Sequence, residues 1–439
     1  MEFIDSTSLV DGWLPTAAWI LGVIGVIFLL LPRQQSKWLV KAVAMAVAAG
    51  ILTYALYWIL LWVASVLSDP LPGAVLAWGV LGVFAVLLGL FGLRGTRAWR
   101  KWLTPLAVVA VLLLCGQQVN AYFGQYVTIG SIYGSDTAKL PTLSKNELRS
   151  PAQGARARSA DIAAIQGWKA PSSMPGRGRL FQATIPGTVS GFVARRAIVY
   201  LPPAYLVARR PQLPVMVLVA GQPGSPQRWL DAGHLETLMN DFAAGHHGLA
   251  PVVVVVDPNG TLTGNTMCMD SRLGNAGTYL SKDVPAWIIG NLDVQGSTSR
   301  WTFGGFSFGG TCAIQMGAAH PDLYPNIIDL SGQVEPALAA NRTVTVAKSF
   351  GGDAAAFNAQ TPMAHLATRR YPHGFAYFSV GADDQHYGPE MLTISAAAKA
   401  AGMHVVTAEV PGVGHSWASA RTGLAGALNL MGPRLGLAK

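Results

Sequence analysis

The chain has 439 residues, of which 51% are hydrophobic and only 12% are charged, and this balance excludes an ordinary soluble protein. The formal net charge is +9, but many Lys and Arg residues lie beside apolar segments and no nucleic-acid-binding motif occurs, so nucleic acid is set aside as a partner. The three cysteines are too few for a disulfide framework and lack metal-ligand spacing, so neither a metal nor another cofactor is expected.

Residues 1–122 are predicted to form a transmembrane domain of four helices. Apolar runs at 12–32, 39–67, 71–93 and 103–122 each approach or exceed the roughly 20 residues that cross a bilayer. Because no basic segment precedes the first run and three more runs follow it, we expect an uncleaved span there and not a signal peptide. No run carries a charge at its middle, which favours an anchor over a channel.

Basic residues beside these runs predict the orientation of the chain. They are Arg33, Lys37 and Lys41 after the first run, and Arg94, Arg97, Arg100 and Lys101 after the third. The N-terminal segment and the turn near Asp69 contain no Lys or Arg. Since basic loops stay in the cytoplasm, everything after the fourth span is predicted to lie outside it, and the protein is expected to be a multi-pass protein of the cell membrane.

Residues 123–176 are predicted to form a linker, because they are rich in Pro, Ser, Gly and Ala. The basic cluster Arg149, Arg156 and Arg158 suits anionic lipid head groups, and a solvated tether without a further role accounts for the composition equally well.

Residues 177–439 alternate between strand and helix patterns. Strands are expected at 197–201, 213–220, 252–256, 301–304, 327–330, 375–380 and 405–410, and helices at 226–244, 279–291, 308–320 and 389–401. The five consecutive valines at 252–256 are typical of a strand buried on both faces. This alternation predicts an α/β domain with a doubly wound parallel sheet.

The pentapeptide Gly305-Phe306-Ser307-Phe308-Gly309 lies between a predicted strand and a predicted helix. A Gly-x-Ser-x-Gly run in that position is the nucleophile elbow of α/β-hydrolases, in which small residues permit a strained turn that exposes the serine oxygen. Ser307 is therefore the predicted nucleophile.

The partners of the serine should follow it in the order acid, then histidine, on loops after later strands. Asp383 and Asp384 follow the strand at 375–380, and His415 follows the last strand in a glycine-rich loop. His415 is the predicted general base, with His386 as a local alternative. Sequence spacing does not separate the two aspartates: one should orient His415, and the other is expected to cap the next helix.

An oxyanion hole needs two backbone N–H groups, one from the residue after the nucleophile and one from the loop after an earlier strand. Phe308 is the predicted first donor. The loop Gly221-Gln222-Pro223 follows an apolar strand, and since Pro223 has no N–H, Gln222 is the predicted second donor. A plain glycine-proline turn is compatible with the same residues.

The second half of the chain resembles the esterase D superfamily, which includes S-formylglutathione hydrolases and the antigen 85 mycolyltransferases. The resemblance spans roughly residues 177–425 and rests on Gly221-Gln222, Tyr279-Leu-x-x-Asp283-Val-Pro-Ala-Trp287, the elbow, Gly381-x-x-Asp384 and Gly414-His415-Ser416-Trp417. It implies an α/β-hydrolase fold and acyl chemistry on serine. In that family the acid commonly takes the last position of Gly-x-x-Asp, which implies Asp384 and leaves Asp383 as the alternative.

With its four preceding spans, the chain is also similar to membrane-anchored actinobacterial esterases, some of which hydrolyse aminoacylated phosphatidylglycerol. This similarity implies a lipid or lipid-derived ester as substrate and the bilayer as partner. Two features depart from the family: Ala220-Gly221 stands in place of a His-Gly pair, and Gln222-Pro223 replaces the apolar residue that often follows that glycine. Both leave the acyl-group preference open.

Cys268 and Cys312 both fall in the half that is expected outside the cytoplasm, where a disulfide between them would brace a loop near Ser307; two buried free thiols are the alternative. Cys115 falls in the fourth span and is assigned to packing.

The leading hypothesis is a membrane-anchored serine esterase without cofactors. An acyltransferase of the mycolyltransferase type and a non-catalytic scaffold on the hydrolase fold are the alternatives. The sequence predicts no oligomeric state.

Overall fold

The computed structural model describes residues 2–31, 37–93, 97–133, 140–144, 148, 165 and 167–437. The chain divides into two compact units: Met1–Ser135 with Leu338–Val344, and Asp136–Ala337 with Thr345–Lys439. Arg149, Arg156 and Arg158, the cluster expected to suit lipid head groups, lie outside the described residues, as do Arg33 and Arg94.

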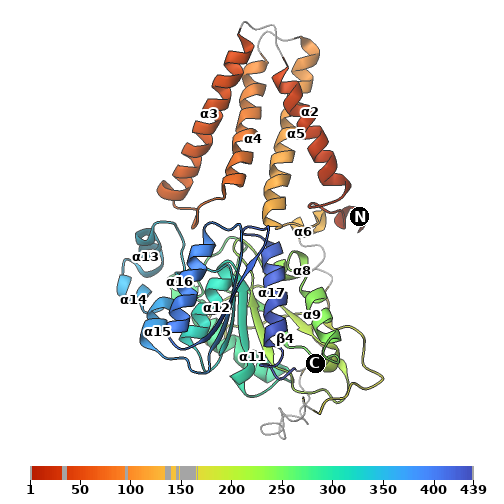
Figure 1. Cartoon of the computed structure of the whole chain (residues 1–439), viewed down its shortest axis with the longest axis vertical. Coiled ribbons are helices and arrows are strands. Elements are labelled where there is room, and N and C mark those ends of the chain that lie inside the picture. Colours follow the sequence, from red (N-terminus) through yellow and green to blue (C-terminus); the bar gives the residue numbers. More distant parts are fainter. Residues whose placement is uncertain are drawn as a thin grey trace. The chain divides into compact units, whose positions relative to one another are not determined.

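The first unit contains four helices that are long and apolar enough to cross a membrane (Figure 1). They are α2 (Trp13–Leu30), α3 (Trp38–Trp58) continued by the π-helix η1 (Ile59–Val63), α4 (Gly73–Gly92) and α5 (Ala98–Phe123). Two short helices, α1 (Glu2–Asp5) and α6 (Ile129–Tyr133), complete the unit. The predicted number of spans is thus matched, and the fourth helix begins five residues earlier than its apolar run.

Small residues bring α2 and α5 together. A Cβ atom at Gly25 would lie 2.8 Å from the carbonyl oxygen of Ala107, and one at Gly22 would lie 2.6 Å from the side chain of Leu114. Because lipid tails are as apolar as leucine, helices in a bilayer associate through such close packing and not through the hydrophobic effect. The bundle interior contains a cluster of buried apolar residues that includes Leu29, Met45, Leu88 and Val111.

The second unit is built on an eight-stranded sheet in the order β1-β2-β4-β3-β7-β8-β9-β10. The strands are β1 (Arg179–Ala183), β2 (Ala197–Leu201), β3 (Val215–Val219), β4 (Val252–Val256), β7 (Thr302–Phe306), β8 (Asn326–Leu330), β9 (Phe375–Gly381) and β10 (His404–Val410). The six strands from β4 to β10 pair in parallel, whereas β1 pairs with β2, and β2 with β4, in antiparallel fashion. The predicted α/β-hydrolase fold is confirmed, with a mixed sheet in place of a wholly parallel one.

Helices cover both faces of this sheet (Figure 1): α12, α15 and α16 lie on one face, and α9 and α17 on the other. The helices of the unit are α8 (Arg228–Asp231), α9 (Leu235–Ala244), α10 (Ala276–Thr278), the π-helix η3 (Tyr279–Asp283), α11 (Val284–Asn291), α12 (Phe308–Ala319), α14 (Ala354–Asn358), α15 (Pro362–Thr368), α16 (Tyr387–Ala400) and α17 (Trp417–Met431). One more helix, α13 (Arg342–Phe350), begins in the segment that belongs to the first unit and ends in the second. Short 3-10 turns occupy Pro203–Leu206 and Thr298–Arg300, and β5 (Asp270–Ser271) pairs with β6 (Gly274–Asn275) in a separate hairpin.

The helix expected over 226–244 is two helices, α8 and α9. Gly233 separates them, in a turn so tight that a Cβ there would lie 2.5 Å from the carbonyl oxygen of Trp229. The following residue, His234, takes a left-handed conformation with φ of 49°. A continuous helix cannot pass through such a turn.

The topology gathers the loops that follow β3, β4, β7, β8, β9 and β10 at one edge of the sheet, because parallel strands end on the same side. These loops carry Gly221–Gly224, Asp257–Thr266, Ser307, Asp384 and His415. Residues far apart in the chain are therefore brought to a single edge.

Candidate active site

Ser307 occupies a sharp turn between β7 and α12, with φ of 57° and ψ of −118°. Such a conformation costs a non-glycine residue on the order of 1–3 kcal/mol and must be held by its surroundings. The glycines of the pentapeptide make room for the turn: a Cβ at Gly305 would lie 2.4 Å from Gly309, and one at Gly309 would lie 2.1 Å from the carbonyl oxygen of Val219. The N–H of Ser307 donates to the carbonyl of Leu330 at 2.7 Å, which fixes the turn on β8.

Ser307, His415 and Asp384 form a continuous hydrogen-bonded relay. His415 Nε2 lies 2.9 Å from Ser307 Oγ, and His415 Nδ1 lies 3.0 Å from Asp384 Oδ2. In the neutral imidazole, Nδ1–H donates to the carboxylate, so that Nε2 is left to accept the serine proton. The relay thus has the connectivity of a nucleophile, a general base and an orienting acid.

Asp384 performs both of the roles that the sequence assigned to separate aspartates. Its Oδ1 accepts the backbone N–H groups of His386 at 3.3 Å and Tyr387 at 3.1 Å, at the start of α16, while its Oδ2 faces His415. Asp383 is exposed, and its N–H donates to the carbonyl of Val413 at 3.0 Å. The structure therefore brings Asp384, and not Asp383, to the histidine.

Two aromatic rings enclose the imidazole of His415. Tyr387 stacks on one side with centroids 4.0 Å apart and an interplanar angle of 18°, and Phe306 stacks at 5.0 Å and 27°. Trp417 packs against Phe306 in turn. This stacking restricts rotation of the imidazole, and aromatic faces suit a protonated imidazole as well as a neutral one. The sequence contained no signal for it, since Phe306 stood only as a variable position of the elbow.

The predicted oxyanion loop lies against the nucleophile: a Cβ at Gly221 would lie 3.4 Å from Ser307 Cβ. Within the described part of the chain, no hydrogen bond occupies the backbone N–H of Gln222 or of Phe308. Phe308 is the first residue of α12, where the helix leaves its N–H groups unpaired and favours negative charge. Both groups are thus available to an oxyanion.

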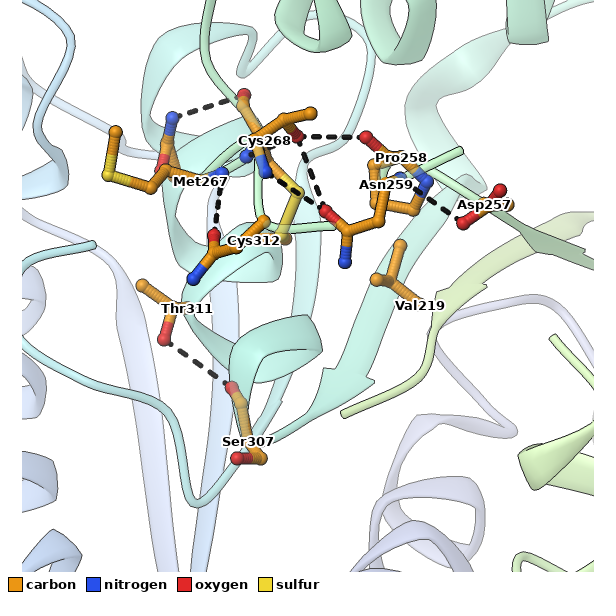
Figure 2. The surroundings of a disulfide bond; sticks show 12 residues. Val219, Asp257, Pro258, Asn259, Met267, Cys268, Ser307, Thr311 and Cys312 are labelled. Atoms are coloured by element: carbon orange, nitrogen blue, oxygen red, sulfur yellow. Dashed lines mark hydrogen bonds between the residues drawn. A yellow bond between two sulfur atoms is a disulfide. The ribbon is translucent and has the colours of Figure 1, made fainter. Parts of the chain in front are cut away.

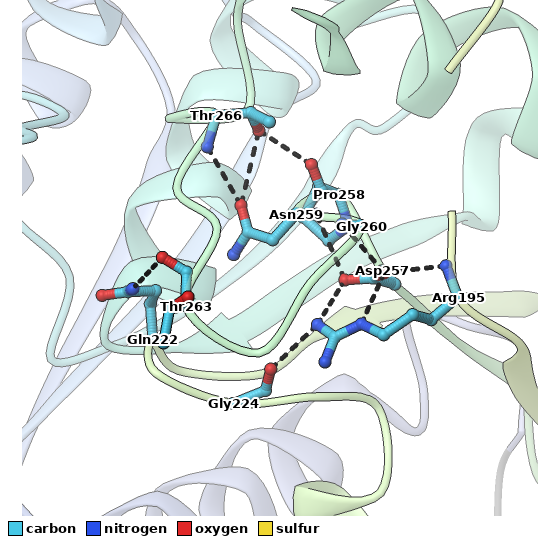
Figure 3. A network of polar contacts seen from close by, with 9 residues as sticks. All are labelled: Arg195, Gln222, Gly224, Asp257, Pro258, Asn259, Gly260, Thr263 and Thr266. Atoms are coloured by element: carbon cyan, nitrogen blue, oxygen red, sulfur yellow. Dashed lines mark hydrogen bonds and ion pairs between the residues drawn. The ribbon is translucent and has the colours of Figure 1, made fainter. Parts of the chain in front are cut away.

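A network of hydrogen bonds and an ion pair fixes the loop Gly221–Gly224 to neighbouring segments (Figure 3). Arg195 donates from Nε and Nη2 to the two carboxylate oxygens of Asp257, at 2.9 and 2.8 Å, and from Nη2 to the carbonyl of Gly224, also at 2.9 Å. The side chain of Gln222 donates to the carbonyl of Thr263 at 3.2 Å. The predicted oxyanion loop is therefore fixed to the segment that follows β4. Sequence reasoning missed Arg195 and Asp257, although an aspartate directly after five buried valines was a usable signal.

The same segment is tied to the nucleophile helix by a disulfide between Cys268 and Cys312, with Cα atoms 5.7 Å apart (Figure 2). Gln315 of α12 adds a hydrogen bond to the carbonyl of Cys268 at 3.2 Å. Cys115 is a free, buried thiol in α5. Across the described residues, no group of three or more His, Cys, Asp or Glu could hold a metal ion.

Comparison with known proteins places this half of the chain in a family. Residues 194–426 match the esterase family described as "Putative esterase". An uncharacterized protein of Corynebacterium glutamicum is 38% identical over 270 residues, which cover 59% of this chain and 63% of that protein, so the match spans less than two thirds of the relative's length.

Solved structures agree in fold. A ferulic acid esterase aligns with a TM-score of 0.50 and 16% identity, over 59% of this chain and 99% of its own. An S-formylglutathione hydrolase from Agrobacterium tumefaciens aligns with a TM-score of 0.50 and 17% identity, over 60% of this chain and 97% of its own. Since the family match covers more than half of the chain, the protein belongs to the esterase family of α/β-hydrolases.

Proposed function

We propose that this protein is a membrane-anchored serine esterase that hydrolyses a lipid-linked ester on the extracytoplasmic side of the membrane. The observation that carries the proposal is the relay from Ser307 through His415 to Asp384, beside two unoccupied backbone N–H groups, in a chain of the esterase family. These groups supply each requirement of acyl transfer through serine.

In the first half of the reaction, Ser307 Oγ attacks the carbonyl carbon of the ester while its proton passes to His415 Nε2. The N–H groups of Phe308 and Gln222 stabilise the negative charge on the carbonyl oxygen. The C–O bond to the alcohol then breaks, and the alcohol leaves with the proton from His415. An acyl group remains on Ser307.

In the second half, His415 takes a proton from a water molecule, which attacks the acyl carbon. The ester bond to Ser307 breaks, the carboxylic acid leaves, and Oγ regains its proton. Asp384 stays ionised throughout, holds the Nδ1–H tautomer and stabilises the imidazolium. The arrangement needs no other reactant than ester and water.

A membrane location is supported by the four helices long enough to span a bilayer. The extracytoplasmic side is supported by the basic residues Lys37, Lys41, Arg97, Arg100 and Lys101, which lie at the N-terminal ends of α3 and α5. The disulfide suits an oxidising compartment. Anchoring would raise the local concentration of a lipid ester in the same membrane, and aminoacylated phosphatidylglycerol is the candidate that the family resemblance favours.

The mechanism is tested with a fluorophosphonate probe and a soluble ester. We expect the unmodified protein to be labelled and Ser307→Ala to be neither labelled nor active. Asp384→Asn should lower kcat by roughly 10⁴-fold, whereas the adjacent Asp383→Asn, a matched control, should change kcat by less than about threefold. Absence of labelling in folded protein would favour the scaffold hypothesis, and a larger loss of kcat in Asp383→Asn would identify Asp383 as the orienting acid.

The substrate is tested by comparing lipid extracts from cells that carry the active protein or Ser307→Ala. An ester that accumulates with the variant is the expected result. If aminoacylated phosphatidylglycerol is unchanged, that substrate is excluded while the esterase activity stands. Supplying a polyol to the acyl-enzyme separates hydrolysis from transfer, because an acyltransferase would pass the acyl group to the polyol faster than to water.

A further inference from the structure

Exposed hydrophobic side chains in the second unit are concentrated in one region. Among its described residues, seven large hydrophobic side chains are exposed, and four of them come from three short segments: Val189 at 68%, Val193 at 84%, Leu262 at 48% and Leu273 at 41%. The other three, Ile289, Leu392 and Leu430, lie on three separate helices. Single exposed apolar residues are normal on a protein surface, whereas a cluster indicates an interaction site.

The three segments are in contact. A Cβ at Gly260 would lie 3.0 Å from the carbonyl oxygen of Val193, and one at Gly274 would lie 3.3 Å from the ring of Phe192. The Gly260–Val193 contact joins the segment after β4 to the segment before β2. The Gly274–Phe192 contact joins the segment before β2 to the β5–β6 hairpin. Val189, Val193, Leu262 and Leu273 thus belong to adjoining segments, and we name these four side chains the apolar rim.

The segment that carries the two valines is held in place by a buried carboxylate. Asp283 accepts the N–H groups of Val189 at 2.7 Å and Ser190 at 3.0 Å, together with the hydroxyl of Thr188 at 3.0 Å. Asn275 adds a hydrogen bond to the carbonyl of Ser190 at 2.9 Å. Since the backbone is fixed at several points, the exposure of the valines is a built feature and not the result of a loose loop.

One member of the apolar rim, Leu262, lies on the segment that contacts the loop beside the candidate active site. The N–H of Gly224, in the oxyanion loop, donates to the carbonyl of Leu262 at 3.2 Å, and the side chain of Gln222 reaches Thr263. Gly221 of the same loop approaches Ser307. A molecule held at the rim would therefore lie beside the loop that contacts the nucleophile.

Charge in this region favours an anionic surface. Arg196 and Arg272 are exposed, whereas the carboxylates of Asp257 and Asp283 are each only 2% exposed and are occupied by hydrogen bonds. Asp270 in the β5–β6 hairpin is partly exposed, and its carboxylate accepts the N–H and the hydroxyl of Thr278. Segments that carry both exposed apolar side chains and exposed arginines suit the boundary between anionic head groups and acyl chains. A solvated protein partner would not require this combination.

We propose that the apolar rim inserts into the head-group region of the bilayer, so that the ester enters the active site from the membrane and not from water. Entry of the ester from the membrane rests on the proposed function, whereas insertion of the rim into the bilayer does not depend on it. We infer that the rim binds the bilayer, and not another partner, because the candidate spans of the same chain keep the second unit near a membrane.

Insertion is tested on the full chain in nanodiscs that contain phosphatidylglycerol. Cys268 and Cys312 are bonded and Cys115 is buried, so Val193→Cys can carry a single environment-sensitive fluorophore. Leu430→Cys, on α17, is the matched control. Lipids with a quencher near the head group should quench the label at residue 193 at least roughly threefold more than at residue 430. Equal quenching at both positions would overturn the proposal, as would protection of residue 193 by a bound soluble protein.

The consequence for catalysis is tested with Val189→Ser/Val193→Ser/Leu273→Ser, matched by Ile289→Ser/Leu392→Ser/Leu430→Ser. The rim variant should lose roughly tenfold in rate on a bilayer-resident ester and keep its rate on a soluble short-chain ester, while the matched variant changes neither. An equal fall on both esters, or no fall on either, would refute entry of the ester from the membrane. If the unmodified protein hydrolyses neither ester, the proposed function fails, and the quenching experiment still decides whether the rim inserts.

Discussion

Arg195→Lys tests whether the position of the oxyanion loop limits the reaction. Lysine keeps the positive charge beside Asp257 but has no planar fork, so it cannot contact both carboxylate oxygens and the carbonyl of Gly224 together. The backbone N–H of residue 195, which also donates to Asp257 at 2.8 Å, is retained. The substitution therefore loosens the loop without removing the charge.

The expected magnitude follows from the bonds that remain. Two charge-assisted hydrogen bonds are lost, each contributing roughly 1.5–3 kcal/mol. We expect the free energy of unfolding to fall by about 3 kcal/mol, the lower end of their sum, because the Arg195 side chain is 27% exposed and Asp257 keeps the N–H groups of Asn259 and Gly260. A single oxyanion donor contributes roughly 2.7–4 kcal/mol to catalysis. Because the loop keeps its contacts to Leu262 and Thr263, we expect only part of this stabilisation of the transition state to be lost. The value of kcat should therefore fall roughly 10–100-fold.

The assay measures kcat and KM on a soluble ester together with the inhibition constant of a boronic acid, which mimics the tetrahedral intermediate. The loss should appear in kcat and in boronate affinity, while KM changes by less than about threefold. Arg196→Lys is the matched control, since the neighbouring side chain is exposed and contacts Gln182 instead. An unchanged kcat in folded Arg195→Lys, or an effect confined to KM, would refute the reasoning.

Two further predictions concern stability. Replacing Cys268 and Cys312 together by serine removes a cross-link with a sequence separation of 44, and the loop-entropy relation predicts a loss of about 4 kcal/mol, visible as a lower thermal midpoint. A midpoint equal to that of the unmodified protein would contradict the relation for this loop. Burial raises the pKa of Asp329 to about 7, with the carboxylate of Glu390 raising it further and the N–H of Gly332 opposing. Because this pKa is raised on folding, the stability it contributes is fully present below pH ~4 and is lost as pH rises through about 7. Asp329→Asn should therefore gain stability over the unmodified protein between pH 5 and pH 8, in thermal unfolding at both pH values; a stability difference that is constant with pH would contradict this.

Most strands of the sheet could be predicted, because strands buried on both faces consist of consecutive apolar residues. The valines at 252–256 form β4 with the expected bounds, and the strand at 197–201 is β2. A run of five apolar residues does not indicate whether the strand pairs in parallel or antiparallel fashion, however. The antiparallel pairing of β2 with its neighbours could therefore not be foreseen. β1 has the sequence Arg-Leu-Phe-Gln-Ala, which is neither a continuous apolar run nor a regular alternation, so it was missed.

The order of Ser307, an aspartate and His415 along the chain could also be anticipated, since each follows a strand end. What escaped prediction depends on contacts between distant residues. Arg195 meets Asp257 across 62 positions, and Tyr387 reaches the imidazole of His415 only because β9 and β10 are neighbours in the sheet. The choice between adjacent Asp383 and Asp384 is made by a backbone turn, in which the N–H of Asp384 donates to Gly381, and not by residue type.

The tightly packed elbow restricts how this enzyme can diverge. A side chain at Gly309 would meet the backbone of Val219, and one at Gly310 would meet the carboxylate of Asp329, 2.4 Å away. Selection for a new ester therefore has little freedom at Gly305, Gly309 and Gly310, where an added side chain would meet atoms of the turn or atoms packed against it. We expect variation that alters the substrate to occur in the loops after β3, β4 and β8. Paralogues with different substrates should therefore share the turn at Ser307 and differ in the sequences of these loops.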